Sequence, residues 1–268
     1  MFEYDLHIKN GEVVDGTGAP KFKADVIVDK GKIIGVFCPD NEDIRDKSEN
    51  HFLSNFKAKK VVNAEHKVVS PGFIDVHTHD DDNVFKDPSL SSKISQGVTT
   101  CIAGNCGISL APFSFKGTVP APIALLGKSD VFNYPRIKDY VDKFKSNPST
   151  VNVALLTGHS MLRVEAMNGD FDRPANSEEI SKMINKLEVA IQDGSIGLST
   201  GLAYPAANAA PTQEIIELTK ILPKYDAIFT THMRNEAVDV IKSVKETIEI
   251  TNTSNVRTVI SHHKCAGR

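Results

Sequence analysis

Apolar and polar residues follow two different patterns along this chain, and the pattern changes near residue 70. Before that point, short segments with β-type alternation are separated by turn residues. Asn10–Gly11 and Lys30–Gly31 tolerate the positive φ of a two-residue turn, so each pair predicts a hairpin. Residues 61–69 form a third candidate hairpin, and the polar stretch 39–51 is typical of a loop. Residues 1–68 are therefore predicted to be an N-terminal β segment.

From residue 69 onward, apolar β-type segments alternate with helical ones. The candidate strands are 72–79, 98–106, 151–159, 195–202, 227–233 and 257–264, and the candidate helices are 88–96, 136–146, 177–194, 212–225 and 236–252. Residues 177–194 form the clearest helix, because Asn176 and Glu179 fit a capping box and Gly194 fits a helix stop. This alternation implies a parallel sheet with right-handed crossovers.

The predicted fold class is α/β, with residues 69–268 forming part of a (β/α)8 TIM-type barrel. Such a barrel needs eight strands and eight helices, whereas the pattern supplies only six strands and five helices. The last strand is followed only by the end of the sequence HHKCAGR. We therefore expect the N-terminal part of a longer chain, with a barrel that is incomplete at its C-terminus. A six-stranded open sheet is the alternative.

Composition narrows the class of protein. The net charge of -3, without a basic patch, predicts no nucleic-acid partner. No apolar run is long enough to span a membrane, and the charged N-terminus does not resemble a signal peptide, so no membrane association and a cytoplasmic location are expected. The 4 cysteines are too scattered for a disulfide framework, and each is expected to be a buried thiol or a metal ligand.

Histidine or cysteine recurs where the candidate strands end. Asp75, His77 and His79 alternate along the first strand, which predicts that they share one face. Four of the five later strands end in the same residue types, namely Cys106, His159, His232 and the pair His262–His263. The carboxyl ends of barrel strands carry the chemistry, and neutral imidazole and thiolate are zinc ligands. The sequence therefore predicts a zinc site at this edge.

Some neighbouring residues have simpler interpretations. Cys101 lies in the middle of its strand and is expected to be a small buried apolar residue. His159 is open between a substrate contact and a structural role, and only one of the adjacent His262 and His263 can face inward. The aspartates at 80–82 are expected to form a solvated loop rather than to bind metal.

Several longer motifs identify a family. The chain carries, in order, SPGFIDVHTHDD, GVTTCIAGNCGISLAP, TGHSMLR, GSIGLSTGLAYP, THMRNEA and ISHHKCAG. Together with the N-terminal DLHIKNGEVVDGTGAPKFKADVIVDKGKI, they resemble the N-acyl-D-amino-acid deacylases (D-aminoacylases) of the amidohydrolase superfamily. The resemblance covers nearly the whole chain except the region around residues 38–60. It implies that residues 1–68 belong to a small β-sandwich and residues 69–268 to a zinc-bearing barrel.

The resemblance also implies site residues. The positions that match metal ligands are His77, His79, Cys106, His232 and His262. They imply one tightly bound Zn²⁺ and leave open a second, weaker site. Lys264 matches a position that can hold the substrate carboxylate, and Tyr204 matches a substrate-contacting tyrosine. The general base of the family is an aspartate on the eighth strand, which is expected beyond the chain end. No catalytic residue is therefore assigned, and Asp75 is expected to be only an interior partner.

The implied reaction is zinc-dependent hydrolysis of the amide bond of an N-acyl-D-amino acid, giving a carboxylic acid and a D-amino acid. The expected partners are this small substrate and the missing C-terminal segment. One alternative is a cyclic-amide hydrolase, such as a dihydroorotase or hydantoinase. Cys106 and the lack of a candidate lysine for carboxylation argue against it. The other alternative is a catalytically silent fragment that needs a second segment.

Overall fold

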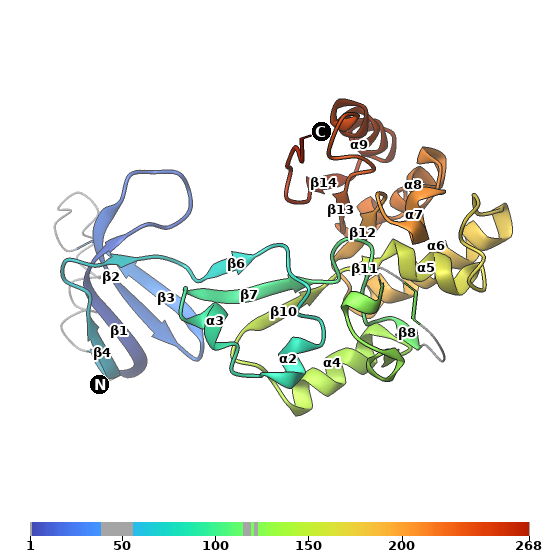
Figure 1. Ribbon diagram of the computed structural model, residues 1–268. Coiled ribbons are helices and arrows are strands. Elements are labelled where there is room, and N and C mark those ends of the chain that lie inside the picture. The colour runs from blue at the N-terminus through green and yellow to red at the C-terminus, as the bar shows by residue number, and fades with distance from the viewer. Residues whose placement is uncertain (1, 39–55, 115–118, 121–122, 268) are drawn as a thin grey trace. The chain divides into compact units, whose positions relative to one another are not determined.

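The structure is a computed structural model that describes residues 2–38, 56–114, 119–120 and 123–267. The chain divides into two compact units, Met1–Gly72 and Phe73–Arg268, and each is described by itself (Figure 1). The loop expected at residues 39–51 lies outside the described residues. The domain division after residue 68 remains a prediction, because compactness does not show the role of either unit.

The first unit is built around one long strand, β1 (Phe2–Val13). This strand pairs antiparallel with β2 (Phe22–Asp29) and parallel with β4 (Phe56–Asn63) and β5 (Val68–Val69). The sheet has the order β3-β2-β1-β4, with β3 (Lys32–Phe37) at one edge. Val13, Ala24 and Val26 form its small buried cluster. The described residues thus form one mixed sheet, and the β-sandwich remains a prediction.

One of the three predicted hairpins of this unit is confirmed. Lys30 and Gly31 have φ values of 49° and 73° and connect β2 to β3. The hairpin at Asn10–Gly11 is wrong, because the positive φ of Asn10 falls at a β-bulge inside β1. The hairpin at residues 61–69 is also wrong, because β4 and β5 are successive segments that both run parallel to β1.

All six candidate strands of the second unit are confirmed. They are β6 (Phe73–Asp75), β7 (Val98–Ala103), β10 (Asn152–Leu155) with β11 (Thr157–Gly158), β12 (Gly197–Gly201), β13 (Ile228–His232) and β14 (Arg257–Ile260). Neighbouring strands pair in parallel in chain order (Figure 1). Leu156 lies between β10 and β11, and its N–H donates to the Ala103 carbonyl at 2.9 Å. The two short strands are therefore parts of one strand position.

The predicted helices are also present. They are α3 (Ser91–Ile94), α4 (Ile137–Ser146), α6 (Ser177–Gln192), α8 (Thr212–Thr219) and α9 (Val240–Ser254). The capping box of α6 is confirmed, because the Asn176 side chain accepts from the Glu179 N–H and the Glu179 carboxylate accepts from the Asn176 N–H. Within the described chain, none of the helices has the length and apolar character needed to cross a membrane.

Several elements escaped the sequence pattern. They are α2 (Asn83–Lys86), α5 (His159–Ala166), α7 (Pro205–Asn208), the short pair β8 (Phe113–Ser114) and β9 (Asn133–Tyr134), and the 3-10 turns Ile123–Leu125, Ser129–Val131 and Leu222–Tyr225. Helix α5 was missed because its first six residues are all buried. A helix covered on every side lacks the polar stripe that reveals helical periodicity.

The two outer strands of this parallel arrangement pair on one side only in the described residues. β6 pairs with β7, and β14 pairs with β13. Phe73 and Ile74 on β6 are both 58% exposed, and Val259 on β14 is 44% exposed. Large apolar side chains on an unpaired edge are typical of a surface that further strands or helices cover.

Candidate metal centre

The five predicted metal ligands lie together. His77 and His79 follow β6, Cys106 follows β7, His232 is the last residue of β13, and His262 follows β14. Because parallel strands direct their carboxyl ends to the same edge, residues far apart in sequence meet there. The side chains form two overlapping groups, His77–His79–Cys106 and Cys106–His232–His262. Within each group the possible ligand atoms all lie within 4.8 Å of one another.

Cys106 is the residue that both groups share. Its Sγ lies 3.3 Å from His77 Nε2 and 3.8 Å from His232 Nδ1. The thiol is buried, and burial raises its pKa to about 11, with the nearby Glu236 carboxylate acting in the same direction. A buried thiol between neutral imidazoles ionises only when a nearby cation stabilises the thiolate. This donor set therefore fits Zn²⁺, which prefers thiolate and imidazole ligands.

The loop that carries Cys106 depends on two glycines. Gly104 and Gly107 have φ values of 81° and 77°, and Cys106 itself has a φ of 55°. A Cβ on Gly104 would stand 2.2 Å from the Leu156 carbonyl oxygen, and one on Gly107 would stand 2.8 Å from the Gly201 backbone nitrogen. The GNCG sequence thus lets the loop pass close to the neighbouring strands and aim the thiol at the histidines.

Burial disfavours the charged form of three histidines of the site, His77, His79 and His232. Burial lowers the pKa of His77 to about 4, and the neighbouring His79 adds to this effect. Burial also lowers the pKa of His79 and of His232, although the Glu236 carboxylate partly offsets the shift of His232. The His232 and His262 ring centroids lie 4.5 Å apart. A neutral imidazole has a free lone pair, so the lowered pKa values of His77, His79 and His232 favour the protonation state that metal binding requires.

The two predicted substrate residues lie beside the ligands. The Tyr204 hydroxyl is 3.2 Å from His232 Nδ1, and the two rings lie 4.7 Å apart. Lys264 Nζ is 3.2 Å from Glu236 Oε2, and the lysine side chain is 52% exposed. Asp75, expected to be an interior partner, accepts a hydrogen bond from Lys93 Nζ at 2.7 Å. The substrate roles of Tyr204 and Lys264 stay predictions.

Two expectations about the first histidine motif are wrong. β6 ends at Asp75, so His77 and His79 reach the site from the segment after the strand and not from its face. The aspartates at 80–82 are not a solvated loop, because Asp81 is fully buried. Asp81 Oδ2 accepts a hydrogen bond from the Gly104 N–H at 3.2 Å, and burial raises the pKa of its carboxyl to about 7. Asp81 therefore anchors the cysteine loop.

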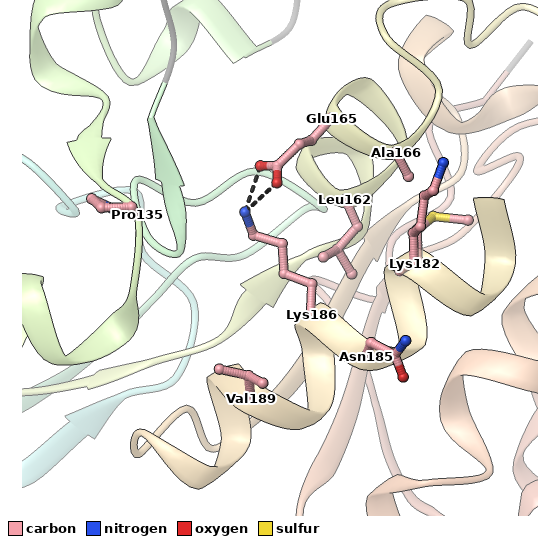
Figure 2. A pocket seen from close by; sticks show the side chains of 9 residues that line it. Pro135, Leu162, Glu165, Ala166, Lys182, Asn185, Lys186 and Val189 are labelled. Atoms are coloured by element: carbon pink, nitrogen blue, oxygen red, sulfur yellow. Dashed lines mark hydrogen bonds and ion pairs between the residues drawn. The ribbon is translucent and has the colours of Figure 1, made fainter. Parts of the chain in front are cut away.

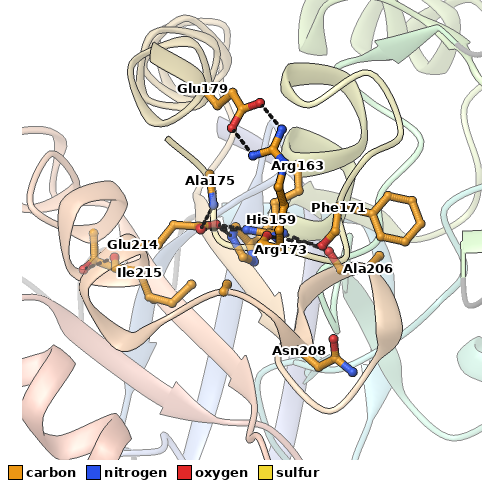
Figure 3. A network of polar contacts seen from close by, with 12 residues as sticks. His159, Arg163, Phe171, Arg173, Ala175, Glu179, Ala206, Asn208, Glu214 and Ile215 are labelled. Carbon is orange, nitrogen blue, oxygen red and sulfur yellow. Dashed lines mark hydrogen bonds and ion pairs between the residues drawn. The ribbon is translucent and has the colours of Figure 1, made fainter. Parts of the chain in front are cut away.

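His159 belongs to a separate buried network (Figure 3). Its Nε2 lies 3.0 Å from Glu214 Oε1, and both side chains are fully buried. Arg163 Nη1 donates to both oxygens of Glu214 at 2.5 and 2.6 Å. The rest of the guanidinium donates to the carbonyls of Ala206, Phe171 and Arg173. His159 lies in neither candidate ligand group of the described residues, and its contacts favour the structural role.

Glu236 is a residue of the site that the sequence analysis missed. Its side chain is 8% exposed and contacts His232, His262 and Lys264. The available signal was a carboxylate four residues after a predicted ligand, in THMRNE. That signal is weak without the fold, because it does not show which way the carboxylate points.

A groove outside the metal centre lies between α5 and α6 (Figure 2). Its volume is about 480 Å³, and its lining includes Leu162, Met183 and Val189. Glu165 and Lys186 form an ion pair across it, as Figure 2 shows. None of the candidate metal ligands lines this groove.

Comparison with known proteins identifies similar chains. A family model described as "Amidohydrolase family" matches residues 60–255. A D-aminoacylase from Alcaligenes xylosoxydans xylosoxydans is 39% identical over 99% of this chain and 51% of that protein. An N-acyl-D-aspartate deacylase from the same organism is 37% identical over 98% of this chain and 50% of that protein. The chain thus spans about half the length of the curated relatives it matches, and the family resemblance seen in the sequence is confirmed.

Solved structures agree with these relatives. A crystal structure of D-aminoacylase superposes with a TM-score of 0.87 and 41% identity, covering 97% of this chain and 52% of that chain. An N-acyl-D-glutamate deacylase from Bordetella bronchiseptica, in complex with zinc and a phosphonate mimic of the tetrahedral intermediate, has a TM-score of 0.87 and 36% identity over 98% and 52%. An L-hydantoinase from Arthrobacter aurescens shares the fold, with a TM-score of 0.57, but only 14% identity over 96% and 52%. These comparisons favour the deacylases over the cyclic-amide hydrolases.

Proposed function

This chain belongs to the amidohydrolase family, and from that membership we propose that it carries the metal-binding part of a zinc-dependent N-acyl-D-amino-acid deacylase. The observation that supports this most is the pair of ligand groups that share Cys106. A shared thiol is the feature that separates this site from a cyclic-amide hydrolase with a carboxylated lysine. The products would be a carboxylic acid and a D-amino acid.

We propose that Cys106, His232 and His262 hold the tightly bound zinc ion. His77 and His79, with Cys106, would form the second and weaker position. When bound, zinc supplies Lewis-acid chemistry, which polarises a carbonyl and favours ionisation of water. Two described side chains would position the substrate. Tyr204 limits the space beside His232, and the Lys264 ammonium would bind the substrate carboxylate.

The architecture that fits this function is a (β/α)8 barrel that begins with the six parallel strand positions described above. Two more strands would pair with the outer edges of β6 and β14 and cover their exposed apolar residues. We propose that a C-terminal segment supplies these strands, the general-base aspartate, and the rest of a β-sandwich around residues 1–68. This chain covers 52% of each solved relative, which supports a C-terminal segment of about the same length as this chain.

Removal of the shared thiol tests the metal centre. Cys106→Ala in the complete protein, purified without chelator, is expected to lose most of its zinc, because both ligand groups lose their sulfur. Elemental analysis measures the zinc content, and circular dichroism checks the fold. Cys101→Ala is the matched control, because this thiol is equally buried but belongs to neither ligand group of the described residues. Full zinc occupancy in Cys106→Ala would remove this residue from the site.

The substrate carboxylate provides a second test. A charge-assisted hydrogen bond from Lys264 contributes roughly 1.5–3 kcal/mol, so Lys264→Met should lower kcat/KM for N-acyl-D-amino acids by about ten- to a hundred-fold. Lys242→Met is the control, because this lysine is 81% exposed and pairs with Asp239, which belongs to neither candidate ligand group of the described residues. Unchanged kinetics in Lys264→Met would contradict the assignment, and equal activity on L-isomers would contradict the proposed substrate class.

A further inference from the structure

Glu236 meets three site residues with one buried carboxylate. Its Oε1 lies 2.7 Å from His262 Nδ1, and its Oε2 lies 3.5 Å from His232 Nε2 and 3.2 Å from Lys264 Nζ. Oε1 is buried and makes no well-aligned hydrogen bond with the described residues, so the close approach of His262 is the contact that can satisfy it. A buried carboxylate needs such partners to offset its loss of hydration.

The backbone around Glu236 fixes the position of this carboxylate. The Glu236 carbonyl accepts a hydrogen bond from the Ala266 N–H at 2.6 Å, which ties the segment after β14 to the segment after β13. The Asn235 side chain accepts from the N–H groups of Ala237 and Asp239, and the Asn235 N–H donates to Ser243 Oγ. The Glu236 carboxylate therefore lies on a turn after β13 that these hydrogen bonds hold in place beside the segment after β14.

The two imidazoles present opposite nitrogens to Glu236. His232 directs Nδ1 toward Cys106 and Tyr204 and leaves Nε2 for the carboxylate. His262 directs Nδ1 toward the carboxylate, so Nε2 is the ring nitrogen that this contact leaves free. Metal-binding histidines commonly donate their other N–H to a carboxylate, and that contact sets the tautomer and the ring orientation.

We propose that Glu236 is a positioning residue that sets the tautomers of His232 and His262 and holds Lys264 beside them. This inference rests on the proposed zinc-dependent function. It adds a group that touches no metal or substrate but couples the ligands of one zinc ion to the lysine that binds the substrate carboxylate. A single carboxylate shared by two ligands would make the metal affinity depend on Glu236 more than on any other acidic residue nearby.

The zinc affinity of the complete protein tests whether Glu236 positions the metal ligands His232 and His262. Glu236→Gln is expected to bind zinc about 10–100-fold more weakly than the unchanged protein in competition with a chelator. Glu246→Gln is the matched control, because Glu246 is a comparably buried carboxylate that pairs with Arg234 and belongs to neither ligand group of the described residues. This control should keep its zinc affinity. Equal affinities for Glu236→Gln and the unchanged protein would overturn the proposal.

Histidine tautomers test the same proposal without a variant of Glu236. Nitrogen-15 NMR of the metal-free unchanged protein, at a pH where the imidazoles are neutral, is expected to show His232 protonated at Nε2 and His262 protonated at Nδ1. His232→Gln and His262→Gln would assign the signals. The opposite tautomer at either ring would overturn the proposal even if Glu236→Gln failed to fold. An unchanged protein that shows these tautomers but binds no zinc would instead contradict the proposed function.

Discussion

Residues 1–268 expressed alone are expected to hydrolyse N-acetyl-D-amino acids about 10²–10⁴-fold more slowly than a protein with the complete barrel. The first reason is chemical. The family resemblance places the general base on the eighth strand, and loss of acid–base assistance costs a factor of this size. No carboxylate of the described residues belongs to either candidate ligand group, and Glu236, which contacts two of the candidate ligands, also pairs with Lys264.

The second reason is structural. His77 and His79 follow β6, and His262 follows β14, so ligands of both groups stand on the strands with open edges. Phe73, Ile74 and Val259 are exposed at those edges. The geometry of the proposed metal centre is therefore expected to depend on closure of the proposed barrel, which the described residues do not supply. Unpaired edges also favour aggregation.

A complementation experiment measures this effect. Residues 1–268 are assayed with added zinc, alone and together with the C-terminal half of the D-aminoacylase relative, supplied as a fusion or as a separate chain. Solubility, zinc content and hydrolysis are expected to rise together in the complemented protein. A soluble monomer of residues 1–268 with kcat near the common ~10 s⁻¹ would contradict both the placement of the base and the need for closure. A complemented protein that closes but stays inactive would favour the catalytically silent alternative.

Replacement of Arg163 is expected to destabilise the second unit by about 3–5 kcal/mol, because it leaves an uncompensated buried charge. Arg163 and Glu214 are both fully buried, and the guanidinium also satisfies the carbonyls of Ala206, Phe171 and Arg173. In Arg163→Met the Glu214 carboxylate would keep, among the described residues, His159 and the Ala175 N–H as partners. The free energy of unfolding of the complete protein, from urea titration, measures the loss.

A surface arginine is the matched control for this change. Arg257 pairs with Asp226 through side chains that are 64% and 89% exposed, and exposed pairs of this kind contribute about 0–1 kcal/mol. Arg257→Met should therefore change stability little. The double variant Arg163→Met/Glu214→Gln should recover part of the lost free energy of unfolding, because it also removes the unpaired negative charge of Glu214. A loss in Arg163→Met no larger than that in Arg257→Met would show that the buried network does not stabilise the fold.

The strand pattern predicted much of the second unit because parallel strands and their crossovers have a strong signature. All six strand positions and the capped helix α6 fall within the predicted ranges, although β6 and β14 end before the histidines that were placed on them. Geometry predicted only that residues at the ends of parallel strands meet at one edge. The choice of ligands came from the family resemblance, and the structure brings those five together, namely His77, His79, Cys106, His232 and His262. Their roles in binding metal remain predictions until zinc is measured.

Local signals failed where the same short sequence signal, a residue that tolerates positive φ followed by glycine, fits two conformations. Asn10 and Lys30 both have positive φ, yet Lys30 turns a hairpin while Asn10 makes a bulge. The difference lies in the partner strands, which the local sequence does not contain. Asp81 was expected in solvent for a similar reason, because a charged residue in a loop is normally hydrated unless another segment brings it a partner, here the Gly104 N–H.

The sequence by itself determined the order of the six strand segments and of five helices in the second unit, and the residue types at the strand ends, because periodicity and residue type are local properties. Only the tertiary structure decided which buried polar groups face one another. His159 meets Glu214, 55 residues away, and Glu236 meets His262 across the gap between two strand ends. The free energy of a buried charge depends on partners within a few ångströms, and those partners are set by how separate strands and helices pack.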